Sequence, residues 1–91
     1  MSRFPLGHCV VTRGAIVLLQ AHRVNAIDLL LRHVNGDDGD LSADDKALNA
    51  AAIASGQDRV FSAYNLPSGG RLWVITEWDR SVTTILLPDE H

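Results

Sequence analysis

The acidic stretch from residue 35 to residue 45 is the first place in this sequence to look for cation chemistry, because it carries five aspartates. A calcium-binding loop needs oxygen ligands at its positions 1, 3, 5 and 12 and a glycine at position 6. Counted from Asn35, position 5 is Gly39, position 6 is Asp40 and position 12 is Lys46, so the pattern fails. We interpret the stretch as a solvated turn that leads into a helix, with a loose cation site as the alternative.

The histidines give a second test for metal chemistry. The sequence contains His8, His22, His33 and His91, and their separations do not match a zinc site. A metal-sensing site formed by His33, Asp37 and Asp40 is one hypothesis, because these residues are close in sequence. A simpler interpretation is that His33 ends a helix, where positive charge is favourable. We therefore predict no metal site and no cofactor.

Metal-free RNA cleavage is the enzymatic activity that these residue types could best support. The reaction needs a base for the 2′-hydroxyl, an acid for the leaving oxygen and a cation for the phosphorane. The candidate groups are His22, His33, Arg59, Arg71, Arg80, Tyr64, Thr76 and Thr84. Small bacterial toxin nucleases also have helices followed by a sheet, which is an analogy of architecture only. A small metal-free ribonuclease-like toxin is therefore the alternative function, and no catalytic residue is assigned.

Aromatic and arginine side chains in the last third of the chain favour protein binding instead. Such residues dominate the binding energy of protein–protein interfaces. The residues that we predict to bind are Tyr64, Trp73, Trp78 and Arg80. The leading hypothesis is a non-catalytic protein that binds another protein, with a homodimer left open.

Three predicted strands would position these side chains. Residues 59–66, 72–78 and 81–87 are rich in β-branched and aromatic residues, and turn sequences separate them. Both faces of the last two strands carry apolar residues. We therefore expect helices on one side of the sheet and a partner or a second copy on the other. Residues 7–12 predict a short first strand, in which the single cysteine, Cys9, is expected to be buried.

Helical patterns fill most of the chain before residue 59. Thr12 precedes the first, Asn25 is a good N-cap for the second, and Ser42 opens the third. The second is predicted to face the core with Ile27, Leu30, Leu31 and Val34, and the third with Ala47, Leu48, Ala51 and Ala52. The sequence predicts a single α+β domain over residues 1–91. Two to three N-terminal helices pack on a three- to four-stranded antiparallel sheet, whose C-terminal part is a meander.

Composition excludes some partners. The chain of 91 residues has 8 Lys and Arg against 11 Asp and Glu, and its net charge is −3. Binding to a nucleic-acid backbone needs clustered basic groups, so we do not expect a nucleic-acid partner. The sequence has neither a run of about 18 apolar residues nor a charged segment followed by an apolar one near its start. We expect no membrane partner and a cytoplasmic protein.

Two segments resemble a known protein family. These are LLLRHVNGDDGDLSADDKALN, residues 29–49, and GRLWVITEWDRSVTTILLPDE, residues 70–90. They are similar to the small "plasmid-related protein" family of bacterial plasmids and integrative mobile elements. The resemblance extends from about residue 7 to residue 90. Its most specific parts are Arg32-His33, Gly36 to Leu41, Ser62 to Tyr64, and Trp73 to Pro88.

The resemblance implies an origin and no activity. It places the protein on mobile DNA in a bacterial cytoplasm, and it provides no catalytic or ligand-binding residue to carry over. The sequence departs from the family pattern at Asp38, where family members have an aromatic residue, usually Trp. If that aromatic residue belongs to a binding surface, this chain binds differently or more weakly.

Overall fold

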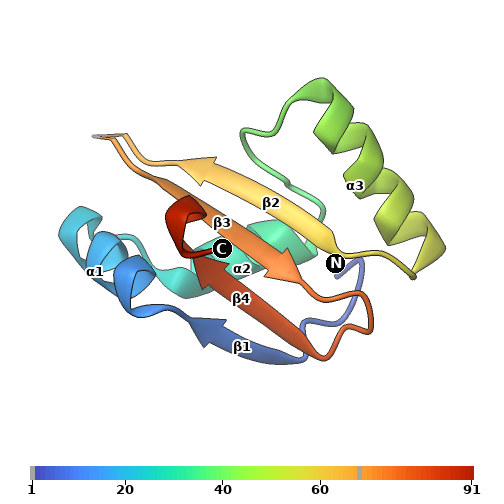
Figure 1. Cartoon of the computed structure of the whole chain (residues 1–91), viewed down its shortest axis with the longest axis horizontal. Coiled ribbons are helices and arrows are strands. Elements are labelled where there is room, and N and C mark those ends of the chain that lie inside the picture. The colour runs from blue at the N-terminus through green and yellow to red at the C-terminus, as the bar shows by residue number, and fades with distance from the viewer. Residues whose placement is uncertain (1, 68) are drawn as a thin grey trace.

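A computed structural model describes residues 2–67 and 69–91 of the chain. Three helices precede the three C-terminal strands, and one short strand comes before all of them (Figure 1). The elements are β1 (His8–Val11), α1 (Arg13–His22), α2 (Ala26–Val34), α3 (Ala43–Ser55), β2 (Val60–Asn65), β3 (Arg71–Thr76), β4 (Val82–Leu86) and a final 3₁₀ turn, η1 (Pro88–Glu90). The predicted α+β class is confirmed.

The sheet has four strands in the order β1-β4-β3-β2. Strands β2, β3 and β4 form the predicted antiparallel meander, with Val60 opposite Thr76 and Thr76 opposite Thr83. Strand β1 pairs with β4 in parallel, so the prediction of a purely antiparallel sheet is wrong and the sheet is mixed. A hairpin forces antiparallel pairing, but β1 is separated from the other strands by three helices, and such a connection also permits parallel pairing.

The main core lies between one face of the sheet and the helices α1 and α2. It consists of Ala15, Leu19, Leu29, Tyr64, Leu66, Leu72, Val74 and Ile85. A smaller cluster of Phe4, Val34 and Val60 extends it toward the N-terminal segment. Helix α3 lies beside β2 at the edge of the sheet (Figure 1). The opposite face of the sheet is therefore left without α1 or α2.

The predicted helix starts are confirmed by their hydrogen bonds. The side chains of Thr12, Asn25 and Ser42 accept from backbone amides in the first turns of α1, α2 and α3. Gly56, with φ of 70°, ends α3 in the left-handed conformation that glycine adopts at low cost. These local signals require no tertiary contact, which explains why the sequence predicts them well.

The predicted core faces of α2 and α3 are partly wrong. Helix α2 buries Leu29, His33 and Val34, while Ile27 and Leu31 are exposed. Helix α2 is rotated about its axis so that His33 faces the sheet. Ile27 and Leu31, two residues of the predicted apolar stripe, therefore face solvent. Helix α3 buries only Asn49 and Ala52, so Ala47, Leu48 and Ala51 are exposed. The reason is that α3 covers the edge of the sheet and not its face.

The acidic loop before α3 is structural. It runs along the outer edge of β2, the side that no other strand pairs with. There the Ala63 amide donates to the Asp38 carbonyl, and the Asp40 amide donates to the Ala63 carbonyl. Gly39 has φ of 71°, and its Cα lies so close to β2 that a Cβ would stand 2.2 Å from the Ala63 carbonyl oxygen. The prediction of a freely solvated turn is therefore wrong for its backbone, because the sheet edge needs these groups.

Helices α1 and α2 have 10 and 9 residues. Within the described residues, no single helix is long and apolar enough to cross a membrane. Taken together, α1 and α2 have the length and composition of one span, but the chain bends by 106° between them. Both helices pack on the sheet through Ala15, Leu19 and Leu29.

Candidate functional site

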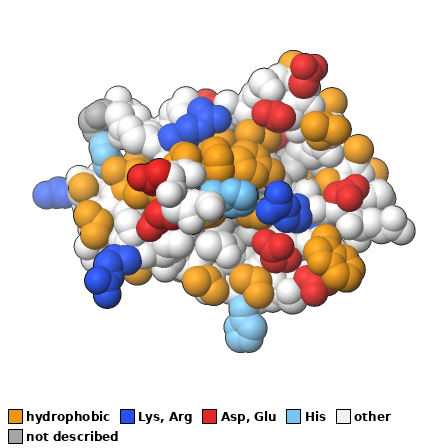
Figure 2. Space-filling view, viewed as in Figure 1, with side chains coloured by type: hydrophobic (Ala, Val, Ile, Leu, Met, Phe, Trp, Pro, Cys, Tyr) orange, Lys and Arg blue, Asp and Glu red, His pale blue; other side chains and the backbone are white. Residues whose placement is uncertain are grey.

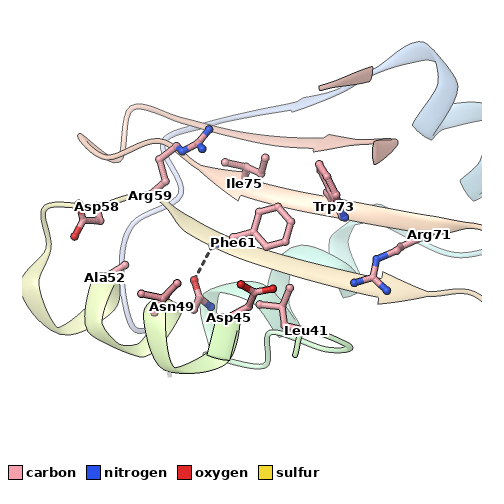
Figure 3. A pocket seen from close by; sticks show the side chains of 11 residues that line it. Leu41, Asp45, Asn49, Ala52, Asp58, Arg59, Phe61, Arg71, Trp73 and Ile75 are labelled. Atoms are coloured by element: carbon pink, nitrogen blue, oxygen red, sulfur yellow. Dashed lines mark hydrogen bonds between the residues drawn. The ribbon is translucent and has the colours of Figure 1, made fainter. Parts of the chain in front are cut away.

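A groove of about 680 Å³ lies between α3 and the face of β2 and β3 that α1 and α2 do not cover (Figure 3). Helix α3 forms one wall and the two strands form the other. The residues that line it are Leu41, Asp45, Leu48, Asn49, Ala52, Asp58, Arg59, Phe61, Arg71, Trp73 and Ile75. We define this set as the α3 groove.

The floor of the α3 groove is aromatic and aliphatic. Phe61 lies opposite Ile75 and two residue pairs from Trp73 in the β2–β3 ladder. The rings of Phe61 and Trp73 meet edge to face, with centroids 5.0 Å apart, and the ring of His91 approaches Trp73 to 5.8 Å. Edge-to-face packing holds these rings in a fixed geometry. The floor is therefore a preformed apolar surface, not a collapsed cluster.

Trp73 also carries an unsatisfied polar group. Its indole Nε1 is buried and has no hydrogen-bond partner among the described residues. An unmatched buried donor costs about 1–3 kcal/mol. The Trp73 indole N–H is therefore a donor at the groove floor that no described residue accepts from.

Charged side chains without partners surround this floor. Within the described residues, the guanidinium of Arg59 and the carboxylates of Asp45 and Asp58 make no hydrogen bond or ion pair. Arg71 donates to the Asn65 side chain at 3.0 Å but has no carboxylate partner there. Figure 2 shows hydrophobic side chains gathered on this face, with basic and acidic groups around them. The groove thus has free charges of both signs on its walls.

The four residues predicted to bind do not form one surface. Trp73 lies in the α3 groove, and Trp78 is exposed in the β3–β4 turn. Tyr64 is only 1% exposed and belongs to the core, where its hydroxyl donates to the Asp37 carbonyl at 2.5 Å. Burial raises the pKa of Tyr64 to about 12. Tyr64 therefore has no surface to offer a partner, and we correct its assignment to a core residue.

Arg80 also has a structural task. Its guanidinium donates to the backbone carbonyls of Ala52, Asp58, Glu77 and Trp78. These contacts tie the end of α3 and the start of β2 to the β3–β4 turn. Arg80 is therefore engaged within its own chain, whereas Arg59 and Arg71 are the arginines that face the groove.

The candidate ribonuclease groups are divided between the two faces of the sheet. Arg59 and Arg71 line the groove, whereas His33 lies on the side of α2, between the hydroxyls of Ser62 at 2.6 Å and Thr76 at 2.9 Å. His33 is 1% exposed, and burial lowers its pKa to about 4. A substrate in the groove would not reach this imidazole through the sheet.

The carboxylates of the proposed cation site have other partners. Asp37 forms an ion pair with Arg32 at 2.7 Å, and this hydrogen bond holds the pKa of Asp37 below its ordinary value. Asp40 accepts from the Asn65 amide at 2.8 Å. Across residues 2–67 and 69–91, no group of three or more His, Cys, Asp or Glu side chains is arranged to hold a metal ion.

Sequence reasoning missed the α3 wall of the groove. Leu48, predicted to pack, is 70% exposed at the rim, and Asn49 accepts from the Phe61 amide at 2.7 Å. The available signal was that Leu48 and Ile53 are the two large apolar residues in a helix of mostly small and polar residues. The Asp38 carboxylate accepts from the side chains of Lys46 and Asn49 beside this wall.

Comparison with known proteins adds no relative to this description. The chain matches no protein-family model, and neither curated proteins nor solved structures give a significant match. The resemblance to the plasmid-related family therefore stays a prediction, and the properties of the α3 groove are the basis for a functional assignment.

Proposed function

We propose that this chain is a non-catalytic accessory protein of a bacterial mobile genetic element, and that it binds a segment of another protein in the α3 groove. The observation that carries the proposal is the combination of an aromatic floor with unpaired charges on both walls. Protein interfaces use such aromatic and arginine anchors. The mobile element and the cytoplasmic location are supported only by the resemblance of residues 7–90.

The covered edge of β2 favours a helical occupant over an added strand. The three outward amides of β2, those of Phe61, Ala63 and Asn65, already donate to Asn49, Asp38 and Asp40. A peptide that extends a sheet needs free backbone groups at the edge. The remaining mode is an amphipathic helix that lays its apolar side chains on Phe61, Trp73 and Ile75.

The distribution of charge defines the chemistry of this helix. Arg59 precedes β2, and Arg71 pairs with its last residue, Asn65. At about 3.3 Å per residue, six residues of strand separate the two arginines by roughly 20 Å. A helix of about 13 residues spans that length. We expect acidic side chains at its two ends on the strand side, and a basic side chain facing Asp45.

The substitution Leu48→Glu tests this proposal. Because Leu48 is 70% exposed at the groove rim, the change adds a charge without removing a core contact. We expect Leu48→Glu to weaken partner binding by about 30-fold or more, the effect of losing a hot-spot contact of roughly 2 kcal/mol. The partner is first captured from bacterial lysate with the unmodified chain and identified, and titration calorimetry then measures the affinity of the purified pair.

Val17→Glu provides the matched control. Val17 is 61% exposed on α1, which packs on the other face of the sheet. This variant should bind like the unmodified chain. Equal affinity of all three proteins would contradict the groove assignment. Growth arrest on expression that Arg71→Ala relieves would instead support the ribonuclease-like alternative.

A further inference from the structure

The two edges of the sheet differ in how their backbone groups are used. Edge strand β2 is covered by the acidic loop and Asn49, which accept from its outward amides. Edge strand β1 pairs only with β4, and no other described segment lies against its outer side (Figure 1). All of β1 except Val11 is exposed. An uncovered edge strand is a template for pairing with another strand.

The register with β4 identifies the free groups. The amides of His8 and Thr12 donate to the carbonyls of Ser81 and Ile85 on the β4 side. In a parallel pair, alternate residues point their amide and carbonyl toward the same neighbour. The amides and carbonyls of Cys9 and Val11 therefore point away from the sheet. They provide two donors and two acceptors, two residues apart.

Apolar surface lies next to this edge. Val10 is 47% exposed on the face opposite α1 and α2. On the helix side, Cys9, predicted to be buried, is exposed, and it lines a depression together with Leu6 and Leu31 of α2. Leu31 and Ile27, one turn apart on α2, are exposed as well. The free edge is thus flanked by apolar side chains on both faces.

We propose that β1 pairs antiparallel with β1 of a second copy, across a two-fold axis at Val10. In this register Cys9 of each chain stands opposite Val11 of the other, and each such pair exchanges two hydrogen bonds. The two Val10 side chains meet at the axis. The two four-stranded sheets become one continuous sheet, with the α2 helices of both copies on the same face of it.

The composition of β1 favours a second copy over a strand of another protein. Its side chains (His8, Cys9, Val10 and Val11) include no lysine, acid or proline, which are the residues that usually keep an edge strand from pairing with itself. A two-fold interface requires self-complementarity, and the alternation of free groups at Cys9 and Val11 provides it. The inference is independent of the proposed function, because β1 and the α3 groove lie at opposite edges of the sheet.

The substitution Val10→Lys tests the interface. It leaves the Val10 backbone bonded to β4 but places two ammonium groups opposite each other at the axis, where like charges destabilise pairing. Sedimentation equilibrium should give a dimer for the unmodified chain, and at least about a tenfold weaker dimer for Val10→Lys. Val17→Lys, on the exposed side of α1, should leave the dimer unchanged.

A cross-link tests the register. With Cys9→Ser in place, Val10→Cys should form a disulfide-linked dimer under mild oxidation, since directly opposed residues of this type have Cα atoms about 4.5 Å apart. Cys9→Ser with Val17→Cys should not. A chain that stays monomeric up to its solubility limit would overturn the proposal. So would a dimer that Val10→Lys does not weaken, or a cross-link that forms equally well at position 17.

Discussion

Lowering the pH from 6.5 to about 4 is expected to remove about 3 kcal/mol from the free energy of unfolding through one side chain, His33. Burial lowers its pKa from 6.5 to about 4 in the folded protein. Between these two values the unfolded chain binds a proton that the folded protein does not. The contribution of neutral His33 to the free energy of unfolding is therefore fully present above pH 6.5, and it is lost as the pH falls toward 4.

The hydrogen bonds around His33 explain why the folded protein keeps the imidazole neutral. The Thr83 hydroxyl donates to the Leu6 carbonyl at 2.7 Å, so the Thr76 hydroxyl must donate to Thr83, at 2.7 Å. Thr76 then accepts from Nε2–H of His33, and Nδ1 accepts from the Ser62 hydroxyl. Each hydroxyl hydrogen is used once. A protonated imidazole has two donors, and Ser62 would have to turn its own hydrogen elsewhere.

Urea unfolding at a series of pH values measures this effect. The unmodified chain should lose stability steadily below pH 6.5, whereas His33→Gln should be less stable at neutral pH but nearly insensitive to pH in this window. Nitrogen chemical shifts of His33 should identify the tautomer with hydrogen on Nε2.

The ion pair of Asp37 does not obscure this window. Its pKa is depressed below 3.8 by the hydrogen bond from Arg32, so its contribution is lost only at lower pH. If the free energy of unfolding of His33→Gln falls with pH as steeply as that of the unmodified chain, a group other than His33 causes the pH dependence.

The contrast between His33 and the helix caps shows how far the sequence alone can predict this structure. Thr12, Asn25 and Ser42 act within one turn of their own helices, so local spacing is sufficient. The burial of His33 depends on how α2 rotates when it docks on strands far away in sequence. Helix-end electrostatics predicts an exposed, charged histidine there, and the docked structure has a buried, neutral one.

The candidate groove shows the same division. Trp73 and Ile75 are two residues apart in β3, so alternation puts them on one face, and the register with β2 adds Phe61 to that face. The alternation does not predict that α3 lies beside β2 and turns Leu48 toward that face. This placement depends on the hydrogen bond from the Phe61 amide to Asn49 and on the close approach of Gly39 to β2. Both contacts join segments that are separate in sequence, so the apolar pattern of neither segment predicts them.

Arg80→Ala is expected to lower the free energy of unfolding by about 2–3 kcal/mol, the range for losing hydrogen bonds from a charged donor. The guanidinium reaches the carbonyls of Asp58 at 2.5 Å, Ala52 and Trp78 at 3.2 Å, and Glu77 at 3.3 Å. The Ser55 hydroxyl and the Gly56 amide also donate to the Ala52 carbonyl, and the Arg80 amide donates to the Glu77 carbonyl. Among the described residues, the carbonyls of Asp58 and Trp78 depend on the guanidinium alone. Truncation at Cβ leaves these carbonyls to whatever water can reach them.

Replacements at this position separate the role of the guanidinium from that of the backbone. Lysine keeps the charge but lacks the planar set of five donors, so Arg80→Lys should recover less than half of the lost stability. Arg80 also has φ of 61°, a conformation that costs a side chain about 1 kcal/mol or more relative to glycine. Arg80→Gly should therefore be more stable than Arg80→Ala, although it loses the same hydrogen bonds.

Arg59→Ala distinguishes structural from binding arginines. Because Arg59 makes no hydrogen bond or ion pair with the described residues, its removal should change the free energy of unfolding by less than about 0.5 kcal/mol. The same variant should weaken partner binding, since Arg59 faces the groove. Urea unfolding of Arg59→Ala and Arg80→Ala compares their free energies of unfolding, and calorimetric titration compares their affinities for the partner. If Arg80→Ala keeps full stability while binding is lost, Arg80 belongs to the binding surface after all, and its carbonyl contacts are incidental.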